Sequence, residues 1–475
     1  MLLCYVGLAV TAPAAAQSPV AYDERLPAPV AAALNAAGIS QASVAVLVQE
    51  VGVNLPRVSV NAGRSMNPAS VMKLLTTYAA LELLGPAYTW RTEAYATGAI
   101  DNGILAGDLV LKGHGDPKLN LESFWLLLRQ LRARGLRDIQ GDLVLDRSHF
   151  ERVDHDPGGF DQEPLRPYNV GPDALLLNFK SVRFQFVPDA DRQTVALLAE
   201  PQPVQLDVVN LVKLGAGPCN DWRAALRPEF FSHDGNARLV FTGIYPAACG
   251  EKTWHFGLLD HPQYVHGVFR QLWQELGGSL GGGLRDGAVP PGARLLAASE
   301  SPALAEVARD INKFSNNVMA RQVFLTLGAE TGRRPARAED ADAAIRAWLA
   351  QKGLNLPELV LENGAGLSRR ERISAEGLAR LLQAAFKSPV MPEFISSLPL
   401  TAVDGTMQKR LKERGVAGRA HVKTGTLEGV KSIAGYVLDA KGRRQIVVFF
   451  VNHANAGGAQ PAQDALLQWV YTRGS

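Results

Sequence analysis

Cysteine is scarce in this sequence, with three residues among 475. No C-x-x-C pair or suitably spaced histidine accompanies them, so the sequence indicates neither a metal site nor another cofactor. An excess of one charge is also lacking, because 49 lysine and arginine residues stand against 46 aspartate and glutamate residues without a block of like charge. A nucleic-acid partner is therefore not expected, and any membrane contact is at most peripheral.

Long apolar runs are missing except at the N-terminus. Residues 2–16 form an apolar stretch that is too short to cross a bilayer and ends in three alanines. This pattern predicts a signal peptide, residues 1–16, that is cleaved after Ala16. No lysine or arginine precedes Arg25, so the basic segment that opens most signal peptides is missing, and we expect the true start to lie upstream.

Two cysteines remain once this leader is removed. Cys219 and Cys249 form an even pair in an exported chain, which favours a disulfide between them. Such a bond stabilises a domain by roughly 3 kcal/mol, mainly by restricting the unfolded chain. Two buried free thiols are the alternative.

Hydrophobic periodicity predicts an α+β fold whose regular elements lie toward both ends of the chain. Residues 27–38 carry a helical pattern, and a second helix begins at Ser70 and stops at Gly85. Alternating β-branched residues predict strands. The expected strands near the two ends are 42–50, 57–62, 421–425, 432–439 and 445–452, and further helices are expected at 265–276, 301–327, 338–352 and 462–471.

The middle of the chain differs in character. Residues 89–261 contain short strands such as 108–112 and 142–146, many turns and the cysteine pair, so a mostly β region is expected. The glycine-rich stretch 277–287 lacks the patterns that bind phosphate and indicates a flexible connection. No repeat period or coiled-coil heptad is present.

A serine and a lysine one helical turn apart form the first candidate catalytic pair. Ser70 and Lys73 belong to an S-x-x-K element, and this spacing brings hydroxyl and amine to one helix face, where a proton can pass between them. Lys73 must then be neutral, and burial lowers the pKa of a lysine. The alternative is a serine cap followed by a solvated lysine.

A polar break in a helical region is the second candidate. It contains Ser315-Asn316-Asn317, an S-x-N element. The same pattern starts at Ser59 and at Ser65, and a helix end satisfied by small polar side chains is the alternative. By itself this element decides nothing.

A lysine on an expected strand is the third candidate. Lys423-Thr424-Gly425-Thr426 combines a cation, hydroxyl groups and a glycine that lets a ligand backbone come close, which suits a bound carboxylate. An ordinary edge-strand lysine before a turn is the alternative. In a shared pocket, Lys423 would repel a protonated Lys73 and favour its neutral form.

The order of the three elements tells more than each alone. S-x-x-K, then S-x-N, then K-T-G is the order found in penicillin-recognising serine acyl transferases. The long gap from Ser70 to Ser315, the mostly β region inside it and the stretch 363–369 (NGAGLSR) resemble the low-molecular-mass class C penicillin-binding proteins, which are D-alanyl-D-alanine carboxypeptidase/endopeptidases of peptidase family S13. Residues 112–117 and 403–406 are also similar to that group.

The resemblance covers essentially the whole mature chain and implies its architecture. Residues 22–88 and 262–475 would form a β-lactamase/transpeptidase-like domain, an antiparallel sheet between helices. Residues 89–261 would be a large, mostly β insertion that forms two nested smaller domains.

The resemblance also implies roles for the motif residues. Ser70 would be the nucleophile and Lys73 its base. Ser315 would relay a proton to the leaving amine, with Lys423 nearby, and Asn317 would hold the substrate amide. The expected substrate-binding residues are Thr424, Gly425 and Thr426 for the terminal D-Ala carboxylate, and Arg369 and Asp161 for the diamino acid of the peptide stem.

The same family implies the partners and the compartment. Peptidoglycan stem peptides would be the substrates, and β-lactam antibiotics would be covalent inhibitors. The mature protein is expected in the periplasm, and no cofactor is implied.

Three other functions compete with this interpretation. A secreted β-lactamase shares the motifs, but a class A enzyme carries E-x-x-L-N, where the nearest stretch here is 351–355 (QKGLN), and an amide cannot act as the base. A catalytically silent peptidoglycan-binding module should have lost a motif residue, and none is lost. A metallopeptidase would draw on His149, Asp154, His155 and Asp156, which lack metal-binding spacing and indicate a solvated loop.

Overall fold

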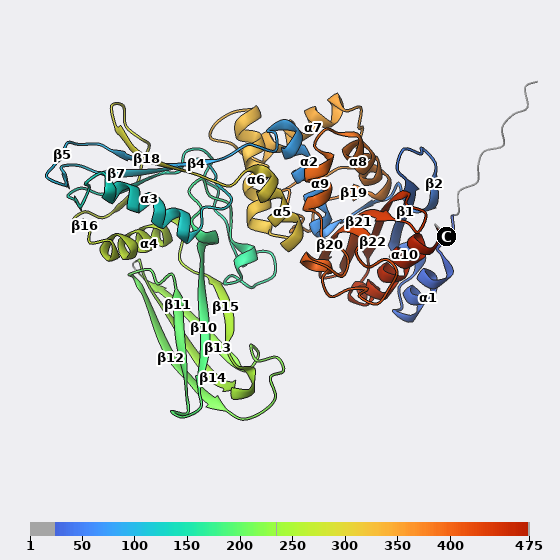
Figure 1. Cartoon of the computed structure of the whole chain (residues 1–475), viewed down its shortest axis with the longest axis horizontal. Coiled ribbons are helices and arrows are strands. Elements are labelled where there is room, and N and C mark those ends of the chain that lie inside the picture. The colour runs from blue at the N-terminus through green and yellow to red at the C-terminus, as the bar shows by residue number, and fades with distance from the viewer. Residues whose placement is uncertain (1–23, 234, 474–475) are drawn as a thin grey trace, which may run out of the picture.

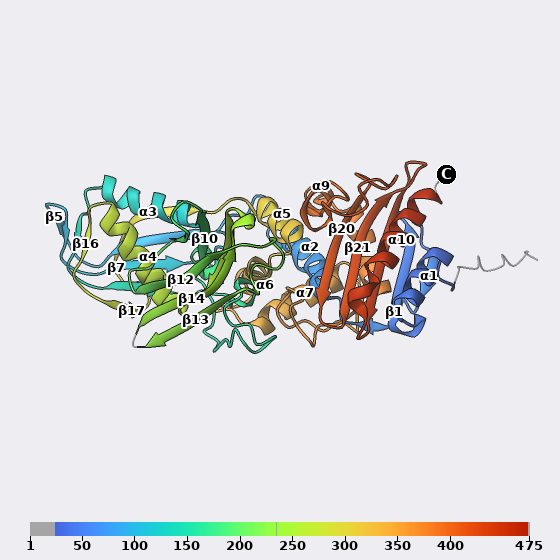
Figure 2. The same cartoon turned by 90° about the horizontal axis from the view of Figure 1, so that it is seen from below.

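The computed structural model describes residues 24–233 and 235–473. The expected signal peptide, residues 1–16, lies outside the described residues. Within them, no helix combines the length and apolar character needed to cross a membrane. Figures 1 and 2 show an elongated molecule in which the two ends of the chain gather in one part and the middle of the chain forms the other.

A five-stranded antiparallel sheet is the centre of the first part, with strand order β2-β1-β22-β21-β20. Its strands come from both ends of the chain, because β1 pairs with β22 along its length, from Val44 opposite Val451 to Glu50 opposite Gln445. This confirms the expected antiparallel sheet. The strands are β1 (Val44–Glu50), β2 (Pro56–Val60), β20 (Ala420–Leu427), β21 (Val430–Leu438) and β22 (Arg444–Asn452).

Helices cover both faces of this sheet, which explains why its strands are apolar on both sides. Side chains alternate between faces along a strand. Val46 and Val48 of β1 pack into one core with α1 (Ala28–Ala36) and α10 (Gln460–Thr472), whereas Ala45 and Leu47 point into a second core. Figure 2 shows α10 lying across the sheet on the face that it shares with α1.

The second core holds the remaining helices of this part. A helix expected to run through 301–327 is broken in two at Ser315, whose backbone is left-handed with φ 57°. The helices are α2 (Lys73–Leu83), α5 (Leu304–Phe314), α6 (Asn317–Thr331), α7 (Ala338–Gln351), α8 (Ala375–Lys387) and α9 (Met391–Ser397), with a short ribbon of β3 (Ser65–Met66) and β19 (Ile373–Ser374). Single 3₁₀ turns are η1 (Gln41–Ser43), η2 (Ala69–Met72), η3 (Pro167–Asn169), η4 (Asn178–Lys180), η5 (Ala247–Cys249), η6 (Gly405–Met407) and η7 (Ala456–Ala459).

The middle of the chain forms two layered units. The first has a five-stranded sheet, β17-β9-β7-β4-β18, beside a small four-stranded one, β16-β8-β6-β5, with helices α3 and α4 packed in the same apolar core. Its elements are β4 (Arg91–Ala96), β5 (Ile100–Asp101), β6 (Ile104–Leu105), β7 (Leu109–Gly113), α3 (Leu121–Ala133), β8 (Asp138–Ile139), β9 (Leu143–Asp146), α4 (His261–Glu275), β16 (Ser279–Leu280), β17 (Leu284–Asp286) and β18 (Arg294–Glu300).

The second unit is a six-stranded sheet, β13-β14-β12-β11-β10-β15, which projects away from the first in Figure 1. A disulfide joins Cys219 and Cys249, as the even pair of cysteines predicts. Their Cα atoms lie 4.8 Å apart. The strands are β10 (Ser181–Asp189), β11 (Thr194–Glu200), β12 (Leu206–Gly215), β13 (Leu226–His233), β14 (Asn236–Pro246) and β15 (Lys252–Gly257).

The inserted region extends beyond its expected end at residue 261. β18 pairs with β4, from Arg294 opposite Ala96 to Glu300 opposite Arg91, and β17 pairs with β9. The sequence pattern of an apolar helix face or of a short strand does not show which sheet the element packs against or joins. The pattern of residues 262–300 therefore cannot assign them to the insertion or to the first part. We place the end of the insertion at about residue 300.

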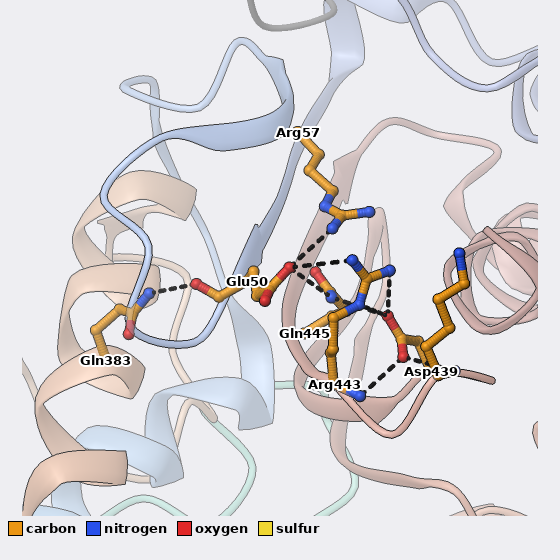
Figure 3. Close-up of polar contacts among 7 residues, drawn as sticks. Glu50, Arg57, Gln383, Asp439, Arg443 and Gln445 are labelled. Carbon is orange, nitrogen blue, oxygen red and sulfur yellow. Dashed lines mark hydrogen bonds and ion pairs between the residues drawn. The ribbon is translucent and has the colours of Figure 1, made fainter. Parts of the chain in front are cut away.

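A cluster of polar side chains ties the hairpin between β21 and β22 to the neighbouring strands (Figure 3). Glu50 accepts a hydrogen bond from Arg57 at 2.8 Å, and Arg443 lies 3.8 Å from the same carboxylate. Asp439 is buried and accepts hydrogen bonds from Arg443 and Gln445. The cluster fixes the end of the sheet where β2, β1, β22 and β21 lie side by side.

Candidate active site

Ser70 lies in the single turn η2, which continues into α2. The sequence predicts an α-helix from Ser70, whereas the structure begins it at Lys73 and leaves Ser70 one turn ahead. Ala69 has a left-handed backbone, φ 47°, which costs a non-glycine residue about 1 kcal/mol or more. A neighbouring loop braces the turn so closely that a Cβ on Gly366 would lie 1.9 Å from the Ala69 carbonyl oxygen.

Lys73 has no exposed surface. Its Nζ lies 3.0 Å from Ser70 Oγ and 2.6 Å from Asn317 Oδ1, and it also contacts the carbonyl oxygen of Ala365. Burial, and after it the charge of Lys423, hold the pKa of Lys73 well below its ordinary value. The sequence suggests both burial and repulsion by Lys423 as causes, and in the structure burial is the larger of the two.

Ser315 and Asn317 contact the two lysines from one break between helices. The left-handed backbone at Ser315 ends α5, and its Oγ accepts a hydrogen bond from Lys423 Nζ at 2.8 Å. Asn317, the first residue of α6, meets Lys73 as described above. An unbroken helix could not direct both side chains in this way, because residues two apart face different sides.

Lys423 comes from strand β20 and is also fully buried. Burial lowers the pKa of Lys423 to about 7, and its Nζ donates a hydrogen bond to the Thr424 carbonyl oxygen at 2.9 Å. Gly425 lets this strand pass against the turn that carries Ser70, because a Cβ there would lie 2.8 Å from the Pro68 carbonyl oxygen. The hydroxyls of Thr424 and Thr406 lie 2.7 Å apart.

The structure thus brings all five expected catalytic residues into two hydrogen-bonded groups. One contains Ser70, Lys73 and Asn317, and the other contains Ser315 and Lys423. Two buried lysines with depressed pKa values beside a partly exposed serine are suited to proton transfer to and from that serine.

A family model described as the D-Ala-D-Ala carboxypeptidase 3 (S13) family matches residues 26–472. The chain belongs to this family. The predicted family, and with it a serine-type carboxypeptidase, is confirmed.

Relatives across bacteria agree with this assignment. The chain is 25% identical over 436 residues to the D-alanyl-D-alanine carboxypeptidase DacB of Haemophilus influenzae, which covers 90% of both chains. It is 29% identical over 426 residues to a D-alanyl-D-alanine carboxypeptidase of an Actinomadura species, covering 85% of this chain and 76% of that one.

The crystal structure of penicillin binding protein 4 from Haemophilus influenzae has a TM-score of 0.73 at 23% identity, over 90% of this chain and 96% of the other. The expected fold class is therefore confirmed.

Glu371 is a buried residue of this S13 site that sequence reasoning missed. It has no exposed surface, and its carboxylate accepts hydrogen bonds from four backbone N–H groups in the loop 362–366, at 2.8–3.1 Å. Burial raises the pKa of Glu371, while these N–H groups and Lys73 oppose the rise. The loop carries the Ala365 carbonyl that contacts Lys73, so Glu371 positions an acceptor for that amine. One glutamate close to a glycine-rich stretch is common in sequences, so nothing in the pattern indicates that Glu371 accepts hydrogen bonds from this loop.

Arg321 is a second buried residue that was missed. It is 7% exposed and lies one turn after Asn317 on α6, on the same helix face. Burial lowers the pKa of Arg321 to about 10, and the charge of Glu371 counters the shift. The site therefore holds three buried basic side chains, Lys73, Lys423 and Arg321, near the buried carboxylate of Glu371.

The two residues expected to contact the diamino acid lie on the rim of the site. The guanidinium of Arg369 is 4.8 Å from the ring centre of Phe160 and donates a hydrogen bond to the Glu428 carbonyl oxygen at 2.9 Å. Asp161, next to that ring in sequence, accepts hydrogen bonds from Tyr168 and Asn169. The insertion thus reaches the end of β20, where the exposed Thr426 lies.

The residues that would make a metallopeptidase do not form a metal site. Within the described residues, no group of three or more metal-ligating side chains comes together. The expectation of a solvated loop holds for residues 154–156 and is wrong for His149, which is 5% exposed and packs against Phe150. Burial lowers the pKa of His149 to about 3, so this ring is a neutral core side chain.

Replacement of the buried Lys423 by methionine should stabilise the protein in a pH-dependent way. The folded chain releases the Lys423 proton near pH 7, whereas the unfolded chain keeps it up to about pH 10.4, so the wild type gains stability as pH rises through this window. The advantage of Lys423→Met in the free energy of unfolding should therefore shrink by about 2 kcal/mol between pH 7 and pH 9. Urea unfolding at both pH values measures it.

The exposed Lys441→Met is the matched control and should show no pH-dependent difference. A constant advantage of Lys423→Met across this range would show that Lys423 keeps its proton in the folded protein.

Replacement of Glu371 by glutamine should change both the rate and the pH profile of acylation. The amide cannot accept all four backbone hydrogen bonds, so the loop shifts, and the rate should fall roughly ten- to a hundredfold. Loss of the negative charge lowers the pKa of Lys73 further, so the acidic limb of the profile should move to lower pH. Stopped-flow acylation by a chromogenic cephalosporin measures both effects.

Glu371→Asp keeps the charge and should keep the position of the acidic limb. If the acidic limb moved equally in the aspartate and glutamine variants, the charge of Glu371 would not be the cause. Glu371 would then act only through packing.

Proposed function

We propose that this protein is a serine-type D-Ala-D-Ala carboxypeptidase and DD-endopeptidase that acts on peptidoglycan stem peptides through an acyl-enzyme on Ser70. The observation that carries the proposal is the fully buried Lys73 amine, 3.0 Å from Ser70 Oγ. Membership of the S13 family and relatives named as D-alanyl-D-alanine carboxypeptidases support it.

Lys73 acts as the base in acylation. A neutral amine has two N–H donors and one lone pair, and its surroundings match this set: Asn317 Oδ1 and the Ala365 carbonyl accept, which leaves the lone pair for the Ser70 hydroxyl. Ser70 Oγ loses its proton to Lys73 Nζ and bonds to the carbonyl carbon of the penultimate D-Ala. The backbone N–H groups of Ser70 and Thr426 hold the oxyanion.

Ser315 and Lys423 complete the collapse of the tetrahedral intermediate. The proton passes from Lys73 through the Ser315 hydroxyl to the amine of the leaving D-Ala as the peptide C–N bond breaks. Lys423 is hydrogen-bonded to Ser315. The terminal carboxylate, which Thr424 and Thr426 bind, favours the protonated form of Lys423, and that positive charge in turn stabilises the carboxylate. Water then hydrolyses the ester and frees Ser70.

The rest of the substrate lies along the edge of β20. The Oδ1 atom of Asn317 accepts a hydrogen bond from Lys73. Its Nδ2 group is left to donate a hydrogen bond to the substrate amide. Gly425 leaves room for the peptide backbone. Arg369 and Asp161 on the rim contact the diamino acid, and the pairing of Arg369 with Glu428 places an acid beside that cation.

β-Lactam antibiotics acylate the same serine. The lactam ring opens without releasing a leaving group, so the acyl-enzyme keeps the whole antibiotic. Gln351 stands where a class A β-lactamase motif would have its glutamate, is exposed and ends α7. Its amide is no base for a hydrolytic water, and deacylation is slow.

We place the mature protein in the periplasm, where its peptidoglycan substrate is found. The disulfide between Cys219 and Cys249 suits an oxidising compartment. The near balance of charge argues against a nucleic-acid partner.

Replacement of Ser70 by alanine should abolish release of D-alanine from a D-Ala-D-Ala pentapeptide, by more than about 10⁴-fold, because the nucleophile is gone. Coupled D-amino acid oxidase assays measure the product. Ser65→Ala removes an exposed serine that lies five residues before Ser70 and should keep wild-type activity. Equal release by Ser70→Ala and wild type would rule out the proposed nucleophile.

Benzylpenicillin should leave a long-lived adduct of one antibiotic molecule on Ser70, detectable by intact-protein and peptide mass spectrometry for hours. Gln351→Glu restores the sequence of the class A motif but should not shorten the lifetime of the adduct. Rapid hydrolysis of benzylpenicillin without an adduct would favour the β-lactamase alternative.

A further inference from the structure

A groove of about 720 Å³ opens beside the catalytic centre, between the insertion and the junction of α5 and α6. Its walls include Ser315 and Asn317, so it is continuous with the proposed active site. On the same junction Phe314 is 65% exposed, a large apolar surface for a side chain next to a catalytic residue. The insertion supplies the opposite wall, which includes Phe179 and Pro201.

The wall around Phe179 is held in an unfavourable backbone conformation. Asn178, Phe179 and Lys180 are three successive left-handed residues, with φ of 46°, 55° and 49°, and each costs about 1–3 kcal/mol in a non-glycine residue. Side-chain hydrogen bonds hold the segment, from Asn178 to the Ser181 carbonyl oxygen and from Lys180 to the Leu259 carbonyl oxygen. In this conformation Phe179 lines the groove and packs against the helical core of the first part.

The rim of the groove carries charge. Arg183 on β10 is exposed and lies between Glu200 on β11 and His255 on β15 in the strand register. Among the described residues, Arg183 forms no ion pair within 4.0 Å. The guanidinium is therefore available for a carboxylate of a ligand that lies along the apolar walls.

We propose that this groove binds the leaving-side stem peptide of a crosslinked substrate, the peptide whose side-chain amine is released when the crosslink is cut. This inference rests on the function proposed above. Ser315 delivers the proton to the leaving amine, so whatever that amine carries must extend past Ser315, which is where the groove begins.

The size and chemistry of the groove fit this occupant. A free D-alanine is far smaller than 720 Å³, whereas a short peptide falls in the range of such sites. The methylene chain of a diamino acid matches the apolar walls formed by Phe314, Phe179 and Pro201, and a free stem carboxylate matches Arg183. The groove thereby favours endopeptidase substrates over monomeric ones.

The test compares one crosslinked and one monomeric substrate on the full-length enzyme. Arg183→Glu and Phe314→Ala should each lower kcat/KM for a purified crosslinked muropeptide dimer roughly tenfold, mainly through KM. Both variants should stay within about twofold of wild type for D-alanine release from the monomeric pentapeptide and for acylation by benzylpenicillin, because these reactions leave the groove empty. Arg227→Glu, an exposed arginine on β13 outside the groove, is the matched control and should change neither substrate.

Each other outcome has a definite meaning. Equal losses on dimer and monomer, or no loss on the dimer, would overturn the leaving-side site. A wild-type enzyme that releases D-alanine but never cleaves the dimer would overturn the site and leave the carboxypeptidase proposal standing. Failure of the wild type on both substrates would overturn the proposed function itself.

Discussion

The burial of the Lys73 amine is the constraint on which the rest of the site depends. An amine without exposed surface needs partners within the protein, and here they come from the turn at Ser70, from Asn317 on α6 and from the loop at Ala365. These segments lie far apart in sequence. Their meeting at one nitrogen fixes how the helices and loops on this side of the sheet must pack, and the same enclosure favours the neutral amine.

Backbones that approach closely make that enclosure possible. β20 passes the turn that carries Ser70 at Gly425, and the loop that Glu371 holds passes the same turn at Gly366, both at distances that leave no room for a Cβ. Much of the surface around Ser70 is therefore formed by main-chain atoms of β20 and of this loop. Hydrogen bonds within the strand and the loop hold these atoms in place. Side-chain chemistry is confined to a few positions, and in the proposed mode of binding the substrate peptide lies against β20.

Local patterns made the sheet and its helices predictable, because apolar alternation and helical periodicity report which faces are buried. The motif residues Ser70, Lys73 and Lys423 were visible because their spacing and order are unusual. Glu371 was not visible, since its role depends on backbone N–H groups that only the folded loop aligns. The end of the insertion was missed for a related reason. The sequence of α4 indicates that one face of this helix is buried, but it does not indicate which part of the molecule that face packs against. The burial of His149 also depends on packing between distant segments.

The pairing of β1 with β22 has a consequence for how the protein is made. Val44 cannot find Val451 until almost the entire chain is available, so the central sheet is a contact of very large sequence separation and is slow to form. The two inserted units contain most of their own partners and can assemble during synthesis. The catalytic half is then completed last, and a chain cut short before residue 444 leaves β1 with an unpaired, apolar edge that other chains can extend.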